Sequence, residues 1–372
     1  MLDSLFSGLS IWLNVLVFVV AASIIWFAGT KLEHRAEGIA DQTGLGRAFV
    51  GMLLLAVATS LPEVATTTTA SLGGNSSMAV HNLLGGVVIQ TAVLAIADLA
   101  AGRNALTFLA PHFVLLIEGV GVIFLLAIVL IGMAGGSEIS SSGGLTSAIG
   151  VGIWLLVLAL AYLLVLYVTY RSQRQTRWTP DTQSNTSRNR QIAASEDADS
   201  QRQKQQSEKQ SSASRRSLTR ICLAFAGFSL LVLVGGWAVA KSGEAFAKQT
   251  GLGSSFVGAT LVALATSLPE ISTTVSAAKN GRYETAFSNI FGSNSCDITL
   301  LILVGLLASG PALIQSASPS AMLAAGVGVL VTCIYLWGLL EREDRSFLRM
   351  GWDSAAVLVV SSLGIMGIYA LS

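Results

Sequence analysis

Charged side chains are scarce in this chain, and their scarcity excludes most soluble folds. Of its 372 residues, 12% are charged and 52% are hydrophobic, and the mean hydropathy is +0.67. Soluble domains carry about 25% charged residues. The net charge of +1 gives no electrostatic reason to bind nucleic acid. We therefore expect an integral membrane protein that lies in a lipid bilayer, with no nucleic-acid partner and no obligatory protein partner.

Cysteine is also rare, and the common catalytic motifs are absent. Cys222, Cys296 and Cys333 all lie in apolar segments, which argues against a disulfide framework. The sequence contains no HExxH, no GxSxG and no Walker phosphate-binding loop. We therefore expect no enzymatic activity and no cofactor. Because there is no nucleotide site, any transport should be driven by an ion gradient.

Long apolar runs, in contrast, are abundant. Crossing the roughly 30 Å of hydrocarbon in a bilayer takes about 20 residues per helix. The ten expected spans cover about 11–29, 47–70, 78–100, 107–133, 147–169, 220–240, 254–278, 284–308, 319–340 and 354–371. Pro62 interrupts the second span and Pro269 the seventh, so both should be broken helices. The expected fold class is an all-α polytopic membrane protein with ten transmembrane helices.

The placement of Lys and Arg predicts the orientation of these spans. The loops after spans 1, 3, 5, 7 and 9 carry most of the basic residues, and Lys241 and Lys248 are the exceptions on the other side. Loops rich in Lys and Arg stay in the cytoplasm. We therefore expect both termini outside, in a bacterial-type inner membrane.

One long segment between the spans is polar and basic. Residues 170–219 are dominated by Gln, Ser and Arg, and the stretch Arg171–Arg220 holds 11 of the 22 Lys and Arg. Such a composition cannot bury enough apolar surface to fold alone, so we expect a disordered cytoplasmic linker. Attraction to anionic lipid headgroups is an alternative role for it. The linker divides the chain into two five-helix halves, 1–169 and 220–372.

The two halves carry related sequences. Thr43–Glu63 and Thr250–Glu270 are identical at 15 of 21 positions, at a constant offset of 207. Since the charge pattern makes the second span run outward and the seventh inward, the two copies should be inverted-topology repeats. Inverted repeats with broken helices are typical of secondary transporters, whose ion site lies where the repeats meet.

Each copy ends in a stripe of oxygen-bearing side chains. Spacings of i, i+3, i+4 and i+7 put four residues of each copy on one helical face, namely Ala56, Thr59, Ser60 and Glu63, and Ala263, Thr266, Ser267 and Glu270. Carboxylates, hydroxyls and the carbonyls freed by proline are hard donors that suit Ca²⁺ and Na⁺. A purely structural alternative is that the Thr and Ser hydroxyls donate hydrogen bonds to carbonyls of their own helix and that each Glu lies in a pore mouth.

The two ATSLPE segments, followed by Ser288–Asp297, resemble the α-repeats of the Ca²⁺/cation antiporter superfamily, most closely prokaryotic Na⁺/Ca²⁺ exchangers. The resemblance covers about 43–100 and 250–307. It implies that Glu63 and Glu270 are central ligands shared in alternation by Ca²⁺ and Na⁺. The resemblance also implies that further positions contribute. They are the hydroxyls of Thr59, Ser60, Thr266 and Ser267, the carbonyls of Ala56 and Ala263, the side chains of Ser293 and Asp297, the motif amides of Asn289 and Asn294, and, in the first half, Asn82 and Gln90.

The first half departs from the family pattern. Aligned without gaps, Gly86 stands where a serine is expected, Val87 where an asparagine is expected, and Gln90 where an Asn or Asp is expected. Loss of oxygen donors should weaken a Na⁺ subsite more than a site built on two glutamates. One alternative is therefore H⁺-coupled antiport on the same fold, and a second is a cation-binding membrane protein that does not transport.

Other ionisable residues lie in or near the expected spans. Glu118 is either structurally paired or functional, since intramembrane ionisable groups can relay protons. We interpret His81 and His112 as hydrogen-bonded residues near the membrane interfaces. Asp98 and Glu284, at the ends of spans, should be solvated.

Overall fold

The structure is a computed structural model, and it describes residues 9–43, 47–72, 76–101, 104–110, 113–141, 144–173, 218–239, 241–242, 245, 249–250, 263–307, 318–341, 346–347 and 350–371. Nearly all of them are helical. Most of the expected basic linker, and His112, therefore lie outside the described residues.

The described elements follow one another as a series of helices with one small sheet. Up to residue 173 they are α2 (Ile11–Thr43), α3 (Arg47–Val50), the π-helix η1 (Gly51–Leu55), α4 (Ala56–Thr59), α5 (Leu61–Leu72), α6 (Ser76–Ala101), α7 (Leu106–Leu109), α8 (Phe113–Ser141) and α9 (Gly144–Gln173). From residue 218 they are the helix Leu218–Val239, α13 (Ala263–Thr266), α14 (Leu268–Lys279), α15 (Tyr283–Leu307), α17 (Pro319–Glu341), the antiparallel strands β1 (Ser346–Phe347) and β2 (Met350–Gly351), and α18 (Trp352–Leu371).

Eight of the described helices are long and apolar enough to cross a membrane. A ninth span is formed if the bent pair Gly51–Thr59 and Leu61–Leu72 is counted as one. The expected span 254–278 is described only from Ala263 onward. The fold is thus that of a polytopic helical membrane protein, and the number ten stays a prediction.

Several helices extend beyond the expected apolar runs. α2 continues to Thr43, 14 residues past the predicted end of the first span at residue 29. Residues 30–43 contain many strong helix formers, such as Lys, Leu, Glu and Ala, and no proline, so nothing local ends the helix at the edge of the apolar run. α9 likewise reaches Gln173, four residues into the expected linker.

Both proline-containing spans are broken, as the sequence predicts. The helix axis bends by 49° between the segment ending at Thr59 and the one beginning at Leu61. Ser60, the residue at the break, has φ −80° and ψ 6°, which is not helical. In the second copy α13 ends at Thr266 and α14 begins at Leu268, with Ser267 between them. Each break stands just before the proline, where the helical hydrogen bond is lost.

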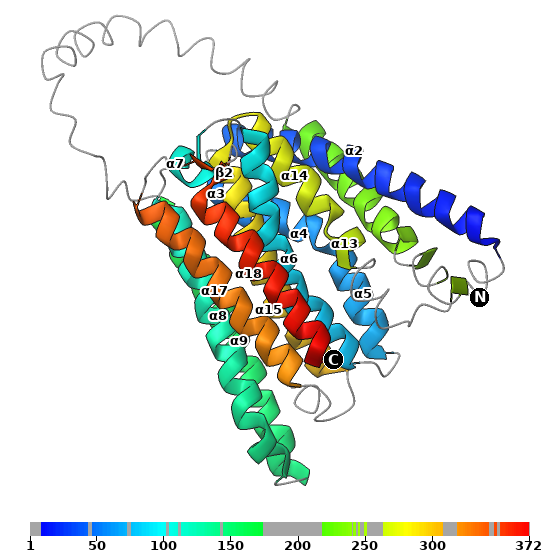
Figure 1. The fold of residues 1–372 in the computed structure, drawn as a ribbon, viewed down its shortest axis with the longest axis vertical. Coiled ribbons are helices and arrows are strands. Elements are labelled where there is room, and N and C mark those ends of the chain that lie inside the picture. The colour runs from blue at the N-terminus through cyan, green and yellow to red at the C-terminus, as the bar shows by residue number, and fades with distance from the viewer. Residues whose placement is uncertain are drawn as a thin grey trace, which may run out of the picture.

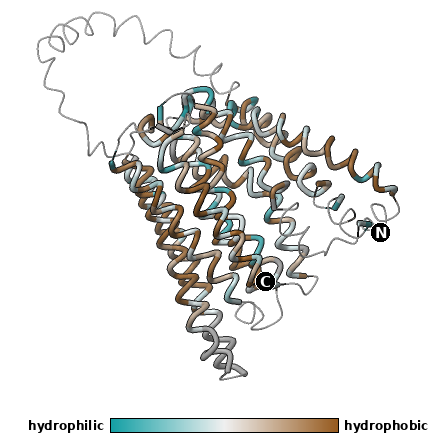
Figure 2. The backbone as a smooth tube through the Cα atoms, viewed as in Figure 1, coloured by the Kyte–Doolittle hydropathy of each residue, from teal (hydrophilic) through white to brown (hydrophobic). Residues whose placement is uncertain are grey.

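The core of the bundle lies between α6, α8, α15 and α17. Phe287, Phe291 and Tyr335 are its largest fully buried side chains, and the ring of Phe287 packs edge-on against Tyr335. Figure 1 shows these helices gathered with α9 and α18 on one side of the molecule. Apolar residues run along nearly every helix (Figure 2).

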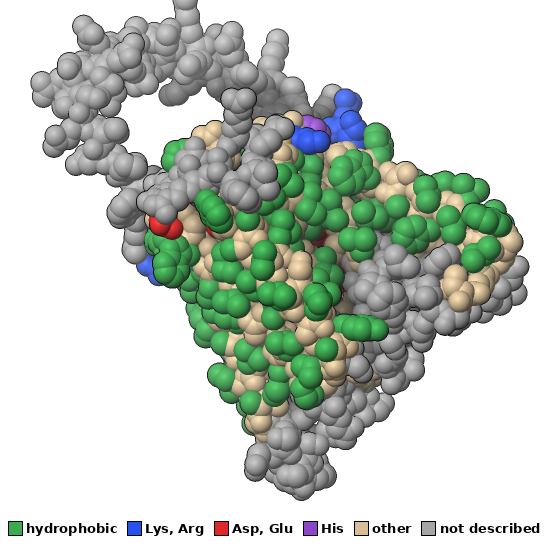
Figure 3. Space-filling view, in the orientation of Figure 1, with side chains coloured by type: hydrophobic (Ala, Val, Ile, Leu, Met, Phe, Trp, Pro, Cys, Tyr) green, Lys and Arg blue, Asp and Glu red, His purple; other side chains and the backbone are tan. Residues whose placement is uncertain are grey.

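The outside of the bundle is apolar too. Large side chains such as Trp12, Ile131 and Trp337 are each more than 70% exposed. On the face in Figure 3, hydrophobic side chains cover the middle, and Lys, Arg and His side chains lie at one end. Such an apolar band with a polar end is what a bilayer requires of a surface.

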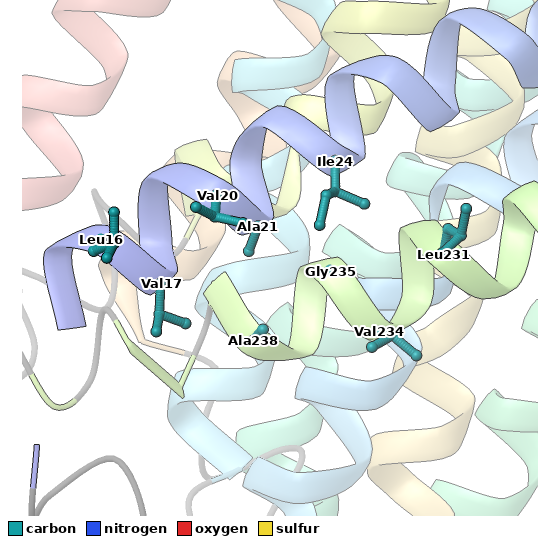
Figure 4. Close-up of a pocket in the computed structure, with 9 residues that line it drawn as sticks. All are labelled: Leu16, Val17, Val20, Ala21, Ile24, Leu231, Val234, Gly235 and Ala238. Atoms are coloured by element: carbon teal, nitrogen blue, oxygen red, sulfur yellow. The ribbon is translucent and has the colours of Figure 1, made fainter. Parts of the chain in front are cut away.

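α2 and the helix Leu218–Val239 lie side by side at one edge of the bundle (Figure 1). Between them runs a groove of about 360 Å³ lined almost wholly by apolar side chains, among them Val20 and Val234 (Figure 4). The groove is local, because the same two helices meet closely beside it: a Cβ on Gly235 would lie 2.7 Å from Ile25 Cγ1.

Candidate functional site

The two helix breaks and α15 bring the predicted carboxylates into one buried region. Glu63 lies in the first turn of α5 and Glu270 in the first turn of α14. Both glutamates and Asp297 of α15 are at most 3% exposed, and the charges of all three act on one another. The amino-terminal end of a helix favours a negative charge, so each break also provides a suitable position for its carboxylate.

Hydroxyl groups lie between the helix break in the first copy and the carboxylate of Glu270. The hydroxyl oxygens of Thr59 and Ser293 are 3.1 Å apart, and Ser293 Oγ donates a 3.4 Å hydrogen bond to Glu270 Oε1. Thr59, Ser60, Thr266 and Ser267 are all buried, as their predicted role requires. The structure thus brings the two repeat stripes and α15 together.

A close crossing of backbones holds α15 in this position. A Cβ atom on Gly292 would lie 2.6 Å from the Cα of Met52 and 2.8 Å from the Cβ of Ala56. Since real Cβ atoms do not approach so closely, only glycine allows α15 to cross η1 and α4 at this point. This crossing carries the next residue, Ser293, to Thr59.

Asp297 is held from the first half of the chain. Gln90 Nε2, on α6, donates a 2.8 Å hydrogen bond to Asp297 Oδ2. The two residues stand 207 positions apart, which is the offset of the sequence repeat. A neighbouring bond, from Asn294 Nδ2 to Thr91 Oγ1 at 2.9 Å, joins the same two helices.

Several oxygens of the region are buried without a hydrogen-bond partner in the described structure. They are Ser60 Oγ, Glu63 Oε2, Gln90 Oε1, Glu270 Oε2 and Asp297 Oδ1. An unsatisfied buried polar atom typically costs about 1–3 kcal/mol, and more when it is charged. Coordination of a cation is one way in which such oxygens are satisfied.

The carboxylates alone do not form a metal site. Among the described residues, no three His, Cys, Asp or Glu side chains come together closely enough to hold a metal ion. A cation bound in this region therefore needs hydroxyl, amide or backbone oxygens as well.

The remaining predicted positions differ in their surroundings. The carbonyl of Ala56 accepts the Ser60 N–H at 2.9 Å and the Thr59 hydroxyl at 3.1 Å, so it already has two donors. Ala263 is the first residue of α13, and Asn82 is only half-buried.

Asn289 has a clear structural contact. Its Nδ2 donates to Thr273 Oγ1 and Thr274 Oγ1, each at 2.9 Å, and so ties α15 to α14. His81 is hydrogen-bonded to Ser320 Oγ at 2.8 Å and to the Ser77 carbonyl at 2.7 Å. The interpretation of His81 as a hydrogen-bonded residue is confirmed.

The expectation for Asp98 was wrong. Its side chain is fully buried, and its two carboxylate oxygens accept the backbone N–H groups of Leu106 and Gly351, each at 2.7 Å. Gly351 lies 253 positions away, so no local sequence signal could have revealed the contact. Glu284 is half-buried rather than fully solvated.

Comparison with known proteins identifies the family. The family model described as "Sodium/calcium exchanger protein" matches residues 13–170 and 221–372. The chain belongs to the sodium/calcium exchanger family. The resemblance of the two repeats to the Ca²⁺/cation antiporter superfamily is thereby confirmed.

Individual relatives in this family are distant. The chain is 24% identical over 287 residues to the inner membrane protein YrbG of Escherichia coli, covering 77% of each chain. It is 46% identical to the sodium/calcium exchanger MaX1 of Methanosarcina acetivorans, over 57 residues, or 15% of this chain and 16% of that one. One structure of the sodium-calcium exchanger NCX_Mj superposes with a TM-score of 0.67 at 18% identity, covering 96% of this chain and 99% of that chain. This last likeness shows a shared fold.

Family membership establishes the broad activity. The protein is an integral membrane antiporter of cations, with Ca²⁺ and Na⁺ as the ions that the family implies. It is a transporter, which agrees with the expectation that it is not an enzyme.

Proposed function

We propose that this protein exchanges Na⁺ for Ca²⁺ by alternating access, with both ions competing for a site built on Glu63 and Glu270. The observation that carries the proposal is the group of buried oxygens without hydrogen-bond partners, two of them on these glutamates. Two carboxylates can balance one divalent cation, and the same oxygens suit Na⁺.

The other ligands come from the stripes of both repeats and from α15. Hydroxyls of Thr59, Ser60, Thr266, Ser267 and Ser293, carbonyls of Ala56 and Ala263, and the side chains of Asp297 and Gln90 complete the set. The Ala56 carbonyl joins it when the Thr59 hydroxyl turns from that carbonyl to the cation. Ca²⁺ takes about 6–8 oxygens, so carboxylates supplemented by hydroxyls fit its needs. Because Asn289 uses its amide nitrogen between α14 and α15, it supports the site, and Asn82 is its counterpart in the first half.

Reciprocal contacts support an inverted-repeat arrangement. The Thr59 side chain interacts with the Glu270 carboxylate, and Thr266, 207 positions after Thr59, interacts with Glu63. When residue i contacts j and the equivalent of i contacts the equivalent of j, two-fold symmetry is the simplest cause. We infer ten spans in two inverted halves, with both termini outside.

Two glycines repeat this reciprocal pattern. A Cβ on Gly29 of α2 would lie 3.4 Å from the carbonyl oxygen of Pro269, on α14. A Cβ on Gly236, at the same offset of 207, would lie 2.6 Å from Pro62 Cβ of α5. Each peripheral helix therefore packs on the broken span of the opposite half.

The carboxylates also supply a rule against slippage. An antiporter must not complete its cycle while empty. With no cation bound, the charges of Glu63, Glu270 and Asp297 repel one another in a buried region, which disfavours the occluded empty state.

A second candidate keeps the fold and the site but uses H⁺ as the coupling ion. It is favoured by the departure of the first repeat, because Gly86 offers no hydroxyl beside Asp297. A Cβ on Gly86 would lie 3.8 Å from Asp297 Oδ2, so a serine here would bring its hydroxyl to that carboxylate.

Calcium uptake into proteoliposomes tests both candidates. ⁴⁵Ca²⁺ uptake should follow an outward Na⁺ gradient, whereas uptake driven only by an outward H⁺ gradient would support the second candidate. Glu63→Gln and Glu270→Gln should each abolish uptake, and Glu341→Gln, at an exposed glutamate that ends α17, is the matched control. Near-normal transport in both site variants would refute the site.

The coupling ion is tested at the altered positions. Gly86→Ser and Gln90→Asn restore residue types that the family pattern expects, so each should change the Na⁺ dependence of uptake more than its Ca²⁺ affinity. Equal effects on the two ions would contradict our interpretation of the first repeat.

A further inference from the structure

A second buried carboxylate lies outside the proposed cation site. Glu118, on α8, is fully buried within the bundle. Ser288 Oγ of α15 donates a 2.6 Å hydrogen bond to its Oε2, and its Oε1 has no hydrogen-bond partner in the described structure. None of the ion pairs found among the described residues involves Glu118.

The Glu118–Ser288 pair faces away from the cation site. On α15 the residues Asn289, Ser293 and Asp297 follow at intervals of four and form one helical face, which is the face of the proposed site. Ser288 precedes this stripe by one position and so points about 100° away from it around the helix. The pair is therefore a separate feature on the α8 side of α15.

A charged Glu118 here would have no compensation. Placing an isolated carboxylate in a buried position is strongly unfavourable unless a positive charge or a proton joins it. Ca²⁺ takes about 6–8 oxygens, whereas the contacts of Glu118 provide its own carboxylate and one hydroxyl. A bound proton, in contrast, needs only the carboxylate and one hydrogen-bond partner.

We propose that Glu118 and Ser288 form a proton-binding site that is distinct from the cation site and regulates it. Glu284, one turn before Ser288 on α15, is half-buried, and its charge acts on Glu118. α8 packs against α9, α15 and α17, and among their described residues Glu284 is the charged group found to act on Glu118. Glu284 therefore connects the buried acid to the more exposed start of α15.

The proton site is linked to the cation site through η1. A Cβ on Gly51, the first residue of η1, would lie 3.1 Å from Ser288 Cβ. η1 leads directly into α4, which ends at Thr59 beside Ser293. π-helical segments are frequent at functional sites and are easily rearranged. Loss of the proton leaves a charge next to this junction, disturbs its packing and slows exchange.

The first test asks whether Glu118 holds a proton, and it needs no transport. Infrared difference spectra of the full chain in lipid nanodiscs, recorded across a pH step, should contain a protonated-carboxyl band that is lost in Glu118→Gln. Glu341→Gln, at an exposed glutamate, should keep that band. Persistence of the complete signal in Glu118→Gln would overturn the proposal.

The second test measures ⁴⁵Ca²⁺ exchange against pH, and it rests on the proposed function. The ratio of wild-type exchange to Glu118→Gln exchange should fall as pH rises, by up to about tenfold per pH unit once the proton is lost, because the carboxylates of the cation site are common to both proteins. Glu118→Gln should keep the basal exchange that wild type shows at low pH, because glutamine mimics the protonated acid. Ser288→Ala should keep the decline but displace its midpoint, because the acid stays and its hydrogen bond is removed.

The two tests fail in different ways. A Glu118→Gln profile identical to that of wild type would refute the regulatory role, and an absent infrared band would refute the proton site. If wild type shows no Ca²⁺ exchange at all, the proposed function fails, while the infrared band still decides the proton site.

Discussion

Arg282 joins the extended end of α2 to the turn between α14 and α15, and its removal should be costly. Its Nη1 donates a 2.5 Å bond to Glu33 Oε1, and its Nη2 pairs with Glu37. The Glu33 side chain is fully buried and also accepts the Ser276 hydroxyl at 3.2 Å. Burial disfavours the charged guanidinium, but the hydrogen bonds and charges of Glu33 and Glu37 outweigh it and raise the pKa of Arg282. Arg282 is therefore charged at any working pH.

The expected loss of stability depends on which of the two charges stays buried without its partner. Arg282→Gln strands Glu33 as a buried anion, and breaking a buried ion pair in this way costs about 3–5 kcal/mol. Because Arg282 is 20% exposed and Ser276 remains as a donor, we expect about 3 kcal/mol. Glu33→Gln leaves Arg282 paired with Glu37, so about 1–2 kcal/mol should be lost. The double variant should be more stable than the sum of the two losses predicts, by about 2 kcal/mol.

Reversible unfolding in mixed detergent micelles, followed by tryptophan fluorescence, measures these differences. Lys279→Gln is the matched control, since it removes the same charge from an exposed side chain three positions away. The argument from burial is refuted if Arg282→Gln and Lys279→Gln agree within about 0.5 kcal/mol, the usual spread of surface substitutions. Strict additivity in the double variant would refute the direct Glu33–Arg282 interaction.

Three further changes test other parts of the structure. Gly292→Val should destabilise the protein by at least about 1–3 kcal/mol, since a Cβ there already meets Met52; an unchanged melting temperature would contradict the close crossing. Asp98→Asn leaves one accepting oxygen for two backbone N–H groups, so one of the two hydrogen bonds, such as that from Gly351, is lost. The free energy of unfolding, measured by the same titration, should fall by about 1.5–3 kcal/mol. Trp154→Phe removes a 3.1 Å bond to a backbone carbonyl of α8 and should cost about 1 kcal/mol; a stabilised variant would argue against that bond.

The sequence predicted those features that depend on local chemistry. Proline removes a donor wherever it stands, so Pro62 and Pro269 marked both helix breaks without any knowledge of the fold. Repetition at a fixed offset singled out Glu63 and Glu270. The continuous helical face expected for each stripe is interrupted at the break, so Thr59 interacts with Glu270 and Thr266 with Glu63 across the two repeats. Apolar length alone predicted most of the membrane helices, because the thickness of the bilayer fixes how long a span must be.

Predictions from the sequence were weaker where a residue's environment depends on distant segments. Asp98 was expected to be solvated because it ends an apolar run, yet its partner Gly351 arrives from the other end of the chain. Glu33 stands beyond the predicted first span, and only the approach of Arg282, 249 positions later, makes it a buried anion.

By itself, the sequence determined a polytopic helical membrane protein with two related copies of an oxygen-rich, proline-broken helix. The tertiary structure alone decided that Gln90 donates to Asp297, that Ser293 bridges Thr59 and Glu270, and that Glu118 lies against Ser288. The physical reason is the bilayer. Helices that lie in lipid are apolar on every side, so they lack the hydrophobic pattern that marks the inward face of a helix in a soluble protein. Which faces meet is then set by close packing at small residues such as Gly292, and that packing depends on the whole fold.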